Sequence, residues 1–345
     1  GRSLIEIIKK EKPEYTLLLT FFSPSGYEIR KNYASADIIT YLPADTIHNA
    51  KKFLSIVKPK YIFFIKYEYW FNYINEAYNQ HIPFYVVSAI FRENQRFFAW
   101  YGKWFRHELS KITYFFTQNE TSKRLLNDIN ISQCEVFGDT RLDTVSELFP
   151  LKDPVIEKFC ADKHTFIAGS TWLEDEKILE TFIKNHDIKW IIAPHEIDEA
   201  HLQQIKSIYR DCACVFYTDV DENTDLNSSK IMIINVIGIL RKIYHYGEIA
   251  YIGGGFGKGI HNILEAATFG KPIVFGPNYH RFKEACDLIE KEAAFPVHTD
   301  KELCETMDKL IQNPLFLSTA SHTVKEYIDS QKGASQKIVT FVFKK

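Results

Sequence analysis

Short apolar runs recur along this chain of 345 residues, and polar stretches long enough for a helix separate most of them. The runs are rich in β-branched and aromatic residues and are apolar at consecutive positions, as expected for strands covered on both faces. Strands that alternate with helices in this way build βαβ units and parallel sheets. The pattern predicts strands at residues 15–21, 61–65, 84–88, 112–116, 135–137, 165–168, 189–193, 213–217, 230–235, 248–252 and 272–275.

The pattern is interrupted at residues 149–154, where Pro150 and Pro154 punctuate the chain. A chain of this length is too long for one ordinary core. We therefore expect an α/β protein of two Rossmann-like domains joined near residue 150. Open parallel sheets bind ligands at the carboxyl ends of their strands, so a cleft between the two domains is the expected active site.

The segment from Tyr251 to Glu265 reads as a buried strand, a glycine-rich turn and a helix that opens with His261 and Asn262. Glycines let backbone N–H groups approach an anionic ligand, and a helix N-terminus favours negative charge, so a nucleotide or phosphate site is predicted here. Glu265 is placed to accept hydrogen bonds from a ribose. The spacing matches neither a P-loop nor a dinucleotide fingerprint. Glycine turns also serve packing alone, and that alternative stays open.

Other predicted strands of the second half also end in polar or small residues. Ser170 and Thr171 follow the strand at 165–168, where they would cap the next helix or contact a phosphate. Pro194 and His195 follow the strand at 189–193, although an isolated histidine is more often structural than a ligand contact. Gly238 follows the strand at 230–235 and would let backbone approach a base.

Three features of the first half suggest chemistry. The segment Ser23-Pro-Ser-Gly-Tyr27 leaves a strand as a turn. Glu68 lies where a carboxylate would face the cleft, although acidic residues also open helices. Arg141 offers a fork for carboxylate or phosphate, and a structural Arg–Asp pair would look the same in the sequence.

Cations and aromatic residues are interleaved from Phe91 to His107. At helical spacing Phe97, Trp100, Tyr101, Trp104 and Phe105 would form one apolar face, suited either to a lipid surface or to the core. Aromatic and basic mixing also suits single-stranded nucleic acid. A net charge of −2 argues against a general nucleic-acid binder.

The composition excludes other classes of protein. No apolar run reaches the length of a membrane span. The six cysteines have neither disulfide-framework nor metal-ligand spacing, which favours free thiols. The acidic stretch around Asp219 and Asp221 is more typical of a solvated loop than of a metal site.

Motifs in family order over nearly the whole chain resemble the 3-deoxy-D-manno-octulosonic acid (Kdo) transferases. The matching segments are Gly1-Arg2, Ser23-Pro-Ser-Gly-Tyr27, Tyr41-Leu-Pro43, Tyr67-Glu-Tyr-Trp70, Gly138-Asp-Thr-Arg-Leu-Asp143, Gly169-Ser-Thr-Trp172, Pro194-His195, Gly253-Gly254 with His261-Asn262, Leu264-Glu-Ala-Ala267 and Gly276-Pro277.

The resemblance implies a GT-B fold with parallel sheets facing a central cleft. It further implies an acceptor domain at residues 1–148, a donor domain at residues 149–325, and a helix at residues 326–345 that crosses back to the first domain. The reaction implied is inverting transfer of Kdo from CMP-Kdo to a lipid A precursor in lipopolysaccharide synthesis. Its place would be the cytoplasmic face of the inner membrane, with peripheral contact through the segment from Phe97 to Phe105. No cofactor, metal or nucleic-acid partner is implied.

The resemblance also implies roles for particular residues. Glu68 and Arg141 would stabilise the transition state. The acceptor site would include Ser23, Ser25, Gly26 and Arg92. The donor site would include Ser170, Thr171, Pro194, His195, Ile237, Gly238, Ile239, Gly254, Gly255, Asn262, Ile263, Leu264 and Glu265.

The chain departs from the family pattern in two places. The usual general base is a glutamate in a segment of the type Gly-Glu-Phe-Glu-Gln-Gly-Arg, and this sequence begins at the final Gly-Arg, so we expect the base upstream of residue 1. Ile239 stands where many relatives carry glutamate. The alternatives that remain are another GT-B transferase or an epimerase using a UDP sugar, and a non-catalytic nucleotide-binding module.

Overall fold

The computed structural model describes residues 1–146, 150–161 and 163–344, and these form two compact units. Unit 1 comprises residues 1–144 and 331–345, and unit 2 comprises residues 145–330. The predicted domain boundary at residues 148 and 149 lies outside the described residues and stays a prediction.

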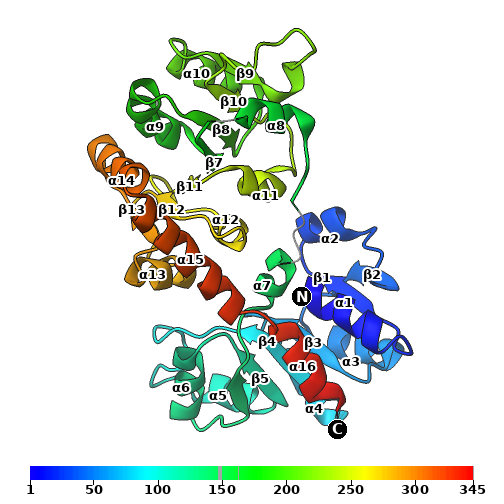
Figure 1. The fold of residues 1–345 in the computed structure, drawn as a ribbon. Coiled ribbons are helices and arrows are strands. Elements are labelled where there is room, and N and C mark those ends of the chain that lie inside the picture. The colour runs from blue at the N-terminus through cyan, green and yellow to red at the C-terminus, as the bar shows by residue number, and fades with distance from the viewer. Residues whose placement is uncertain (147–149, 162, 345) are drawn as a thin grey trace. The chain divides into compact units, whose positions relative to one another are not determined.

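Unit 1 is built on a parallel sheet in the order β3-β4-β5-β6 (Figure 1). A second, two-stranded parallel sheet pairs β1 with β2. The strands are β1 (Leu18–Phe21), β2 (Ile38–Tyr41), β3 (Ile62–Ile65), β4 (Phe84–Ala89), β5 (Tyr114–Thr117) and β6 (Cys134–Val136). The helices are α1 (Arg2–Glu11), α2 (Pro24–Arg30), α3 (Ile47–Val57), α4 (Phe71–Asn79), α5 (Lys103–Ser110), α6 (Glu120–Asp128), α7 (Thr140–Ser146) and α16 (Ala334–Phe343).

Helices cover both faces of the larger sheet, and alternate residues of β4 show how. Phe84 and Val86 belong to the core formed with α3, α4, α5 and α6. Tyr85 and Val87 point to the other face, where they belong to a core formed with α1 and α16. Because successive side chains of a strand point to opposite faces, a strand covered on both faces must be apolar throughout.

The C-terminal helix α16 is tied to the rest of unit 1 by a buried carboxylate. Asp143 accepts hydrogen bonds from the backbone N–H groups of Gly333 (2.6 Å) and Ser335 (2.7 Å), which are among the orphan donors at a helix start. The hydroxyl of Ser335 contacts that of Ser3 on α1 (2.8 Å), and Ser3 donates to the carbonyl of Thr140 (3.0 Å). A polar network therefore joins α1, α7 and α16.

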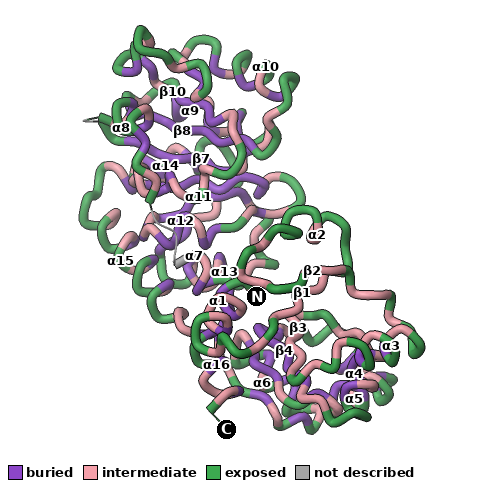
Figure 2. Tube along the Cα trace, turned by 90° about the vertical axis from the view of Figure 1, so that its right-hand side faces the viewer, coloured by how far each residue is buried: buried purple, intermediate pink, exposed green. Residues whose placement is uncertain are grey.

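Unit 2 contains one parallel sheet in the order β13-β12-β11-β7-β8-β10-β9. Most of its strands are buried along their whole length, as the purple segments of Figure 2 show. The strands are β7 (Thr165–Thr171), β8 (Lys189–Pro194), β9 (Cys214–Phe216), β10 (Ile231–Ile233), β11 (Ile249–Ile252), β12 (Ile273–Phe275) and β13 (Ala294–Pro296). The helices are α8 (Pro154–Cys160), α9 (Leu173–Asn185), α10 (Glu199–Ile208), α11 (Leu240–Ile243), α12 (Leu264–Thr268), α13 (Lys283–Glu290), α14 (Asp300–Gln312) and α15 (Pro314–Ser330), with short 3₁₀ turns at Tyr217–Asp219 and Tyr244–Tyr246.

The strand order of unit 2 reverses between β7 and β11. From β7 the chain adds β8, β9 and β10 on one side and then crosses to place β11, β12 and β13 on the other. In open parallel sheets such a reversal leaves a crevice at the carboxyl ends of the two central strands. The residues after β7 and β11 therefore lie where open parallel sheets generally bind ligands.

Every predicted strand has a counterpart, and the prediction of parallel α/β units is confirmed. Two strands were missed. β2 is a partly exposed strand of a two-stranded sheet, and β13 is a three-residue edge strand ending in Pro296, so neither produces a long apolar run. The helical face predicted from Phe97 to Phe105 is wrong, because α5 begins only at Lys103. Residues 326–345 do not form one helix, since α15 ends at Ser330 and α16 begins at Ala334.

No helix in the described ranges is long and apolar enough to cross a membrane.

Asp143→Ala should loosen α16 at its N-terminus, because two helix N–H groups lose a charged acceptor. We expect a loss of about 1–3 kcal/mol in the local stability of α16. Hydrogen exchange of residues 334–343 measures this directly. The matched control is Asp128→Ala at the exposed end of α6, which should leave exchange in α16 unchanged. Equal exchange rates in the two variants would contradict the role of Asp143.

Candidate functional site

The carboxyl end of β7 bulges next to β8, at Ser170. The register of the two strands shifts between Gly169 and Thr171, and Ser170 adopts φ +55°. Gly169 packs so tightly that an added Cβ would lie 1.9 Å from the Tyr244 hydroxyl. The bulge therefore turns the chain at the position where the fold predicts a ligand crevice.

A buried carboxylate, Asp175, accepts hydrogen bonds from two backbone N–H groups and one hydroxyl near the carboxyl ends of β7 and β11. Its Oδ2 accepts the N–H groups of Trp172 (2.9 Å) and Gly254 (2.8 Å), and its Oδ1 accepts the hydroxyl of Tyr251 (2.8 Å). Burial raises the pKa of Asp175, and these three donors oppose that shift because they favour the carboxylate. Asp175 thus connects the start of α9 to the end of β11 and to the glycine turn.

The cap of α9 differs from the sequence expectation. Ser170 and Thr171 were expected to cap this helix, whereas Trp172 is the N-cap residue and Asp175 satisfies its N–H. Thr171 is buried and donates its hydroxyl to Glu176 (2.9 Å), which also contacts His201 (3.0 Å). These contacts give Thr171 a structural role, and its predicted ligand contact stays a prediction.

The glycine turn after β11 is held mainly by close backbone contacts. Gly254 has φ +88°, and its N–H is directed to Asp175. A Cβ at Gly253 would lie 2.2 Å from the Ser170 carbonyl oxygen, and one at Gly255 would lie 2.5 Å from the Gly276 nitrogen. The packing alternative therefore explains Gly253, Gly254 and Gly255. The predicted ligand contacts of Gly254 and Gly255 stay predictions.

Three rings stack beside this turn. His195, which follows β8, lies 4.7 Å from the Trp172 ring and 4.3 Å from the His261 ring, centroid to centroid. Trp172 Nε1 donates to His261 Nε2 (2.9 Å). Burial lowers the pKa of His261, and the neighbouring His195 lowers it further. His195 is exposed, and His261 is half-buried.

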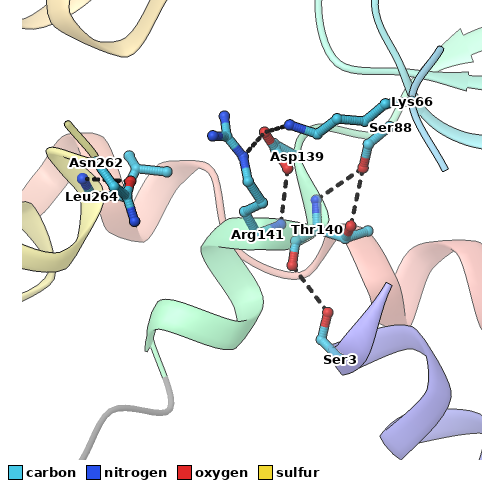
Figure 3. Close-up of polar contacts among 8 residues, drawn as sticks. All are labelled: Ser3, Lys66, Ser88, Asp139, Thr140, Arg141, Asn262 and Leu264. Atoms are coloured by element: carbon cyan, nitrogen blue, oxygen red, sulfur yellow. Dashed lines mark hydrogen bonds and ion pairs between the residues drawn. The ribbon is translucent and has the colours of Figure 1, made fainter. Parts of the chain in front are cut away.

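The helix after the glycine turn is shorter than expected. It begins at Leu264 rather than at His261, and it has only one and a half turns. Asn262 satisfies a backbone donor at the start of this helix, because its Oδ1 accepts the Leu264 N–H (3.2 Å; Figure 3). Its Nδ2 donates to the Glu265 carboxylate (3.3 Å). Burial raises the pKa of Glu265, whereas Asn262 and Arg241 oppose the shift. Ile263 and Leu264 are buried.

The segment after β10 is more open than the glycine turn. Gly238 has φ +95° and an added Cβ would meet no atom within 4 Å, and Ile237 is 88% exposed. Ile239 is half-buried before α11. Because all strands of unit 2 are parallel, the residues after β7, β8, β10 and β11 share one edge of the sheet. Pro194 pairs with Thr171 in the ladder, so these segments are neighbours.

In unit 1, Asp139 lies at the centre of a charged cluster. It accepts Arg141 Nε (2.7 Å) and the Arg141 backbone N–H (2.8 Å), and Lys66 Nζ lies 3.7 Å from its Oδ2 (Figure 3). The Arg–Asp pair left open by the sequence is therefore present, with a second cation added. Asp139 thus gathers two cations at the end of β3 and β6.

The other unit 1 candidates, Glu68, Ser23, Ser25 and Arg92, are exposed, and Gly26 is half-buried. Glu68 accepts the Trp70 indole N–H (2.7 Å). Ser23 caps α2 by accepting the Gly26 N–H (3.3 Å), and its hydroxyl lies 3.3 Å from that of Ser25. Arg92 extends from the loop after β4, where its backbone N–H donates to Gln95.

The aromatic segment divides between core and surface instead of forming one helical face. Phe97 is buried, whereas Trp100, Tyr101 and Trp104 are 91%, 61% and 54% exposed. The side chain of Arg106 holds the turn by donating to the carbonyls of Phe97 (3.1 Å) and Ala99 (2.9 Å).

Sequence reasoning assigned no role to Trp172, Asp175, Lys66 or Asp139. Each follows a predicted strand closely, which is a usable signal, but their roles depend on contacts with residues far away in the sequence.

Gly255→Ala should destabilise unit 2 by about 1–3 kcal/mol, because the new methyl group would overlap the Gly276 backbone, which cannot rotate away. Gly257→Ala is the matched control in the same turn, since its nearest contact would be 3.7 Å. Thermal unfolding measures both variants. Equal melting temperatures would show that the Gly255 contact with Gly276 is not a constraint.

Comparisons with known proteins agree with this architecture. Residues 1–144 match the family model of 3-deoxy-D-manno-octulosonic-acid transferase (kdotransferase). A 3-deoxy-D-manno-octulosonic acid transferase of Rickettsia conorii is 26% identical over 343 residues, covering 96% of this chain and 73% of the relative. The corresponding transferase of Aquifex aeolicus is 28% identical, covering 90% of this chain and 82% of the relative. A bifunctional glycosyltransferase/methyltransferase of Fusobacterium nucleatum is 26% identical over 85% of this chain, which spans about half (48%) of that relative.

Solved structures show the fold. UDP-GlcNAc 2-epimerase of Neisseria meningitidis, bound to UDP-GlcNAc, superposes with a TM-score of 0.69 at 17% identity, over 99% of this chain and 95% of that one. MurG of Acinetobacter baumannii superposes with a TM-score of 0.59 at 14% identity, over 100% and 95%. The expected GT-B-type fold is thereby confirmed. The family model matches residues 1–144, and the transferases of Rickettsia conorii and Aquifex aeolicus are similar over most of the chain, so the chain is similar to the Kdo transferase family.

Proposed function

We propose that this protein is an inverting glycosyltransferase that moves Kdo from CMP-Kdo to a lipid A precursor in lipopolysaccharide synthesis. The observation that carries the proposal is the grouping of family-matching residues in unit 2. Ser170, Pro194 with His195, and Asn262 with Glu265 follow three neighbouring parallel strands, β7, β8 and β11, at the reversal of strand order. This is where open α/β sheets bind nucleotides.

In the proposed reaction, a hydroxyl oxygen of the acceptor attacks the anomeric carbon of Kdo. The bond between that carbon and the phosphate oxygen breaks, its electron pair leaves with CMP, and the hydroxyl proton passes to a base. We assign Arg141 and Glu68 to stabilisation of the transition state in unit 1, where Arg141 belongs to the charged cluster around Asp139. No residue of this sequence is assigned as the base.

On the donor side, the proposal assigns Glu265 to a ribose hydroxyl. Its carboxylate is half-buried and fixed by Asn262, so it is an oriented acceptor. Gly238 and its exposed neighbour Ile237 offer accessible backbone for the base. Helix termini and hydrogen-bond donors are sufficient to hold a phosphate monoester leaving group, so the proposal needs no metal.

A second candidate is an epimerase or transferase that uses a UDP sugar. It is favoured by one observation, the full-length superposition on an epimerase bound to UDP-GlcNAc. A fold shared at 17% identity does not select the nucleotide. A non-catalytic nucleotide-binding module is a third candidate, which transfer of Kdo in a reconstituted assay would exclude.

We assign membrane binding to the exposed rings of Trp100, Tyr101 and Trp104. They would contact an anionic lipid bilayer at the cytoplasmic face of the inner membrane. The exposed rings lie in one short segment with the exposed cations Arg96 and Lys103. Tryptophan and tyrosine favour the bilayer interface, and the cations suit acidic headgroups. Contact with the bilayer would bring the protein to the membrane that holds its lipid acceptor.

Calorimetric titration with CMP and with UDP tests the donor assignment. We expect the protein to bind CMP and to discriminate against UDP. Glu265→Ala should weaken CMP binding by about 1–3 kcal/mol, because a hydrogen bond to a charged group is lost. Glu290→Ala, an exposed carboxylate on α13, is the control. Preference for UDP would favour the second candidate, and CMP affinity unchanged in Glu265→Ala would remove Glu265 from the site.

Replacing Trp100 and Trp104 together by Ser should reduce binding to vesicles that contain an anionic lipid, with little change in melting temperature. Tyr78→Ser is the control, since Tyr78 is an exposed ring (55%) elsewhere in unit 1. Sedimentation with vesicles measures the effect. A lower melting temperature with unchanged vesicle binding would show that the two rings serve packing.

A further inference from the structure

The ring stack of unit 2 defines the protonation pattern of one histidine. Trp172 Nε1 lies 2.9 Å from His261 Nε2. An indole nitrogen only donates, so His261 Nε2 must be the acceptor and carry no hydrogen. The neutral imidazole then carries its hydrogen on Nδ1. The tautomer follows from the chemistry of the two partners.

The surroundings keep this imidazole neutral. Burial lowers the pKa of His261, and the ring of His195, 4.3 Å away, adds to that shift because two adjacent histidines resist double protonation. Protonation would also place a hydrogen on Nε2, directly against the Trp172 N–H. His261 is therefore a neutral donor rather than a cation.

The orientation of the ring shows where that donor points. A Cβ on Gly254 would lie 3.0 Å from His261 Cδ2 and 3.2 Å from Nε2, so this edge of the ring faces the glycine turn. Nδ1 is the ring atom opposite that edge and lies on the side away from the turn. Among the residues that the structure describes, none accepts a hydrogen bond from His261 Nδ1.

We propose that His261 Nδ1–H donates a hydrogen bond to the phosphate of the bound nucleotide, and that Trp172 is the positioning residue that holds this tautomer. The inference rests on the proposed function in placing a nucleotide at the β7 and β11 reversal. An anionic oxygen accepts hydrogen bonds and carries no hydrogen of its own, so it matches a donor of fixed direction. Asp175 supports the arrangement, since it holds the backbone on both sides, at Trp172 and at Gly254.

The first test is long-range ¹H–¹⁵N NMR of the full chain without ligand, which reports histidine tautomers. We expect His261 to be the Nδ1–H tautomer in the wild type. Trp172→Phe keeps an aromatic ring in the stack and removes the N–H, so the preference should be lost. Trp100→Phe is the control and should leave the spectrum of His261 unchanged. An Nε2–H tautomer in the wild type would overturn the assignment.

The second test compares CMP with cytidine, which lacks the phosphate. His261→Phe should weaken CMP binding on the order of tenfold and leave cytidine binding unchanged, since only the phosphate contact is lost. Trp172→Phe should weaken CMP in the same selective way. Equal losses of CMP and cytidine affinity would mean that the rings only shape the binding site. Unchanged CMP affinity in His261→Phe would overturn the phosphate contact and leave the proposed function standing.

CMP binding by the wild type distinguishes failure of the proposed function from failure of the phosphate contact alone. If it binds no CMP, the proposed donor is wrong and the phosphate contact is overturned with it. The tautomer measurement still decides the role of Trp172, because it requires no ligand. Melting temperatures of Trp172→Phe and His261→Phe establish that both variants fold.

Discussion

The candidate site of unit 2 depends on the buried carboxylate of Asp175. Three donors from three segments converge on it, the N–H of Trp172, the N–H of Gly254 and the hydroxyl of Tyr251. A carboxylate is the only side chain that accepts from all three without presenting a hydrogen of its own. Hydrogen bonds to a charged group in a low-dielectric interior are strong, and leaving these donors unpaired would be costly. The Asp175 carboxylate therefore holds the start of α9 next to the ends of β7 and β11. The positions of the three rings and of the glycine turn depend on these hydrogen bonds.

The glycines at this edge divide into two physical classes. Gly253 and Gly255 lie where a methyl group would overlap the backbone at Ser170 and at Gly276, after β7 and β12, and one at Gly169 would overlap the Tyr244 hydroxyl. Gly238 has the same freedom of φ but open space around it. The first three glycines permit close packing, whereas the loop at Gly238 leaves its backbone accessible. A glycine-rich sequence alone does not distinguish these two uses.

Much of the fold could be predicted from the sequence because parallel strands covered on both faces must be apolar throughout, and that signal is local. β2 and β13 lacked it, being partly exposed or at an edge. The helical face expected from Phe97 to Phe105 is wrong, because the Arg106 side chain donates to two backbone carbonyls and the chain packs closely at Gly102, and both hold turns before α5. Among the candidate site residues, Glu265, Arg141 and His195 were predicted from their place after strands, and their roles stay predictions. Trp172 and Asp175 were not predicted, because their partners, His261 and Gly254, are 89 and 79 residues away along the chain.

Both units use the same device at the carboxyl end of a central strand. β4 shifts register between Val87 and Ala89 with Ser88 at φ +52°, and β7 shifts between Gly169 and Thr171 with Ser170 at φ +55°. A non-glycine residue in this region costs on the order of 1 kcal/mol or more and persists only where its surroundings determine it. For Ser88 the surroundings are visible, since its hydroxyl accepts the Thr140 N–H (3.0 Å) and contacts the Thr140 hydroxyl (3.1 Å; Figure 3). For Ser170 they are the contacts of its carbonyl with Gly253. Each bulge turns the chain at the edge where parallel sheets bind ligands, and each is fixed by the segment that carries the next candidate residue, Arg141 in one unit and the glycine turn in the other.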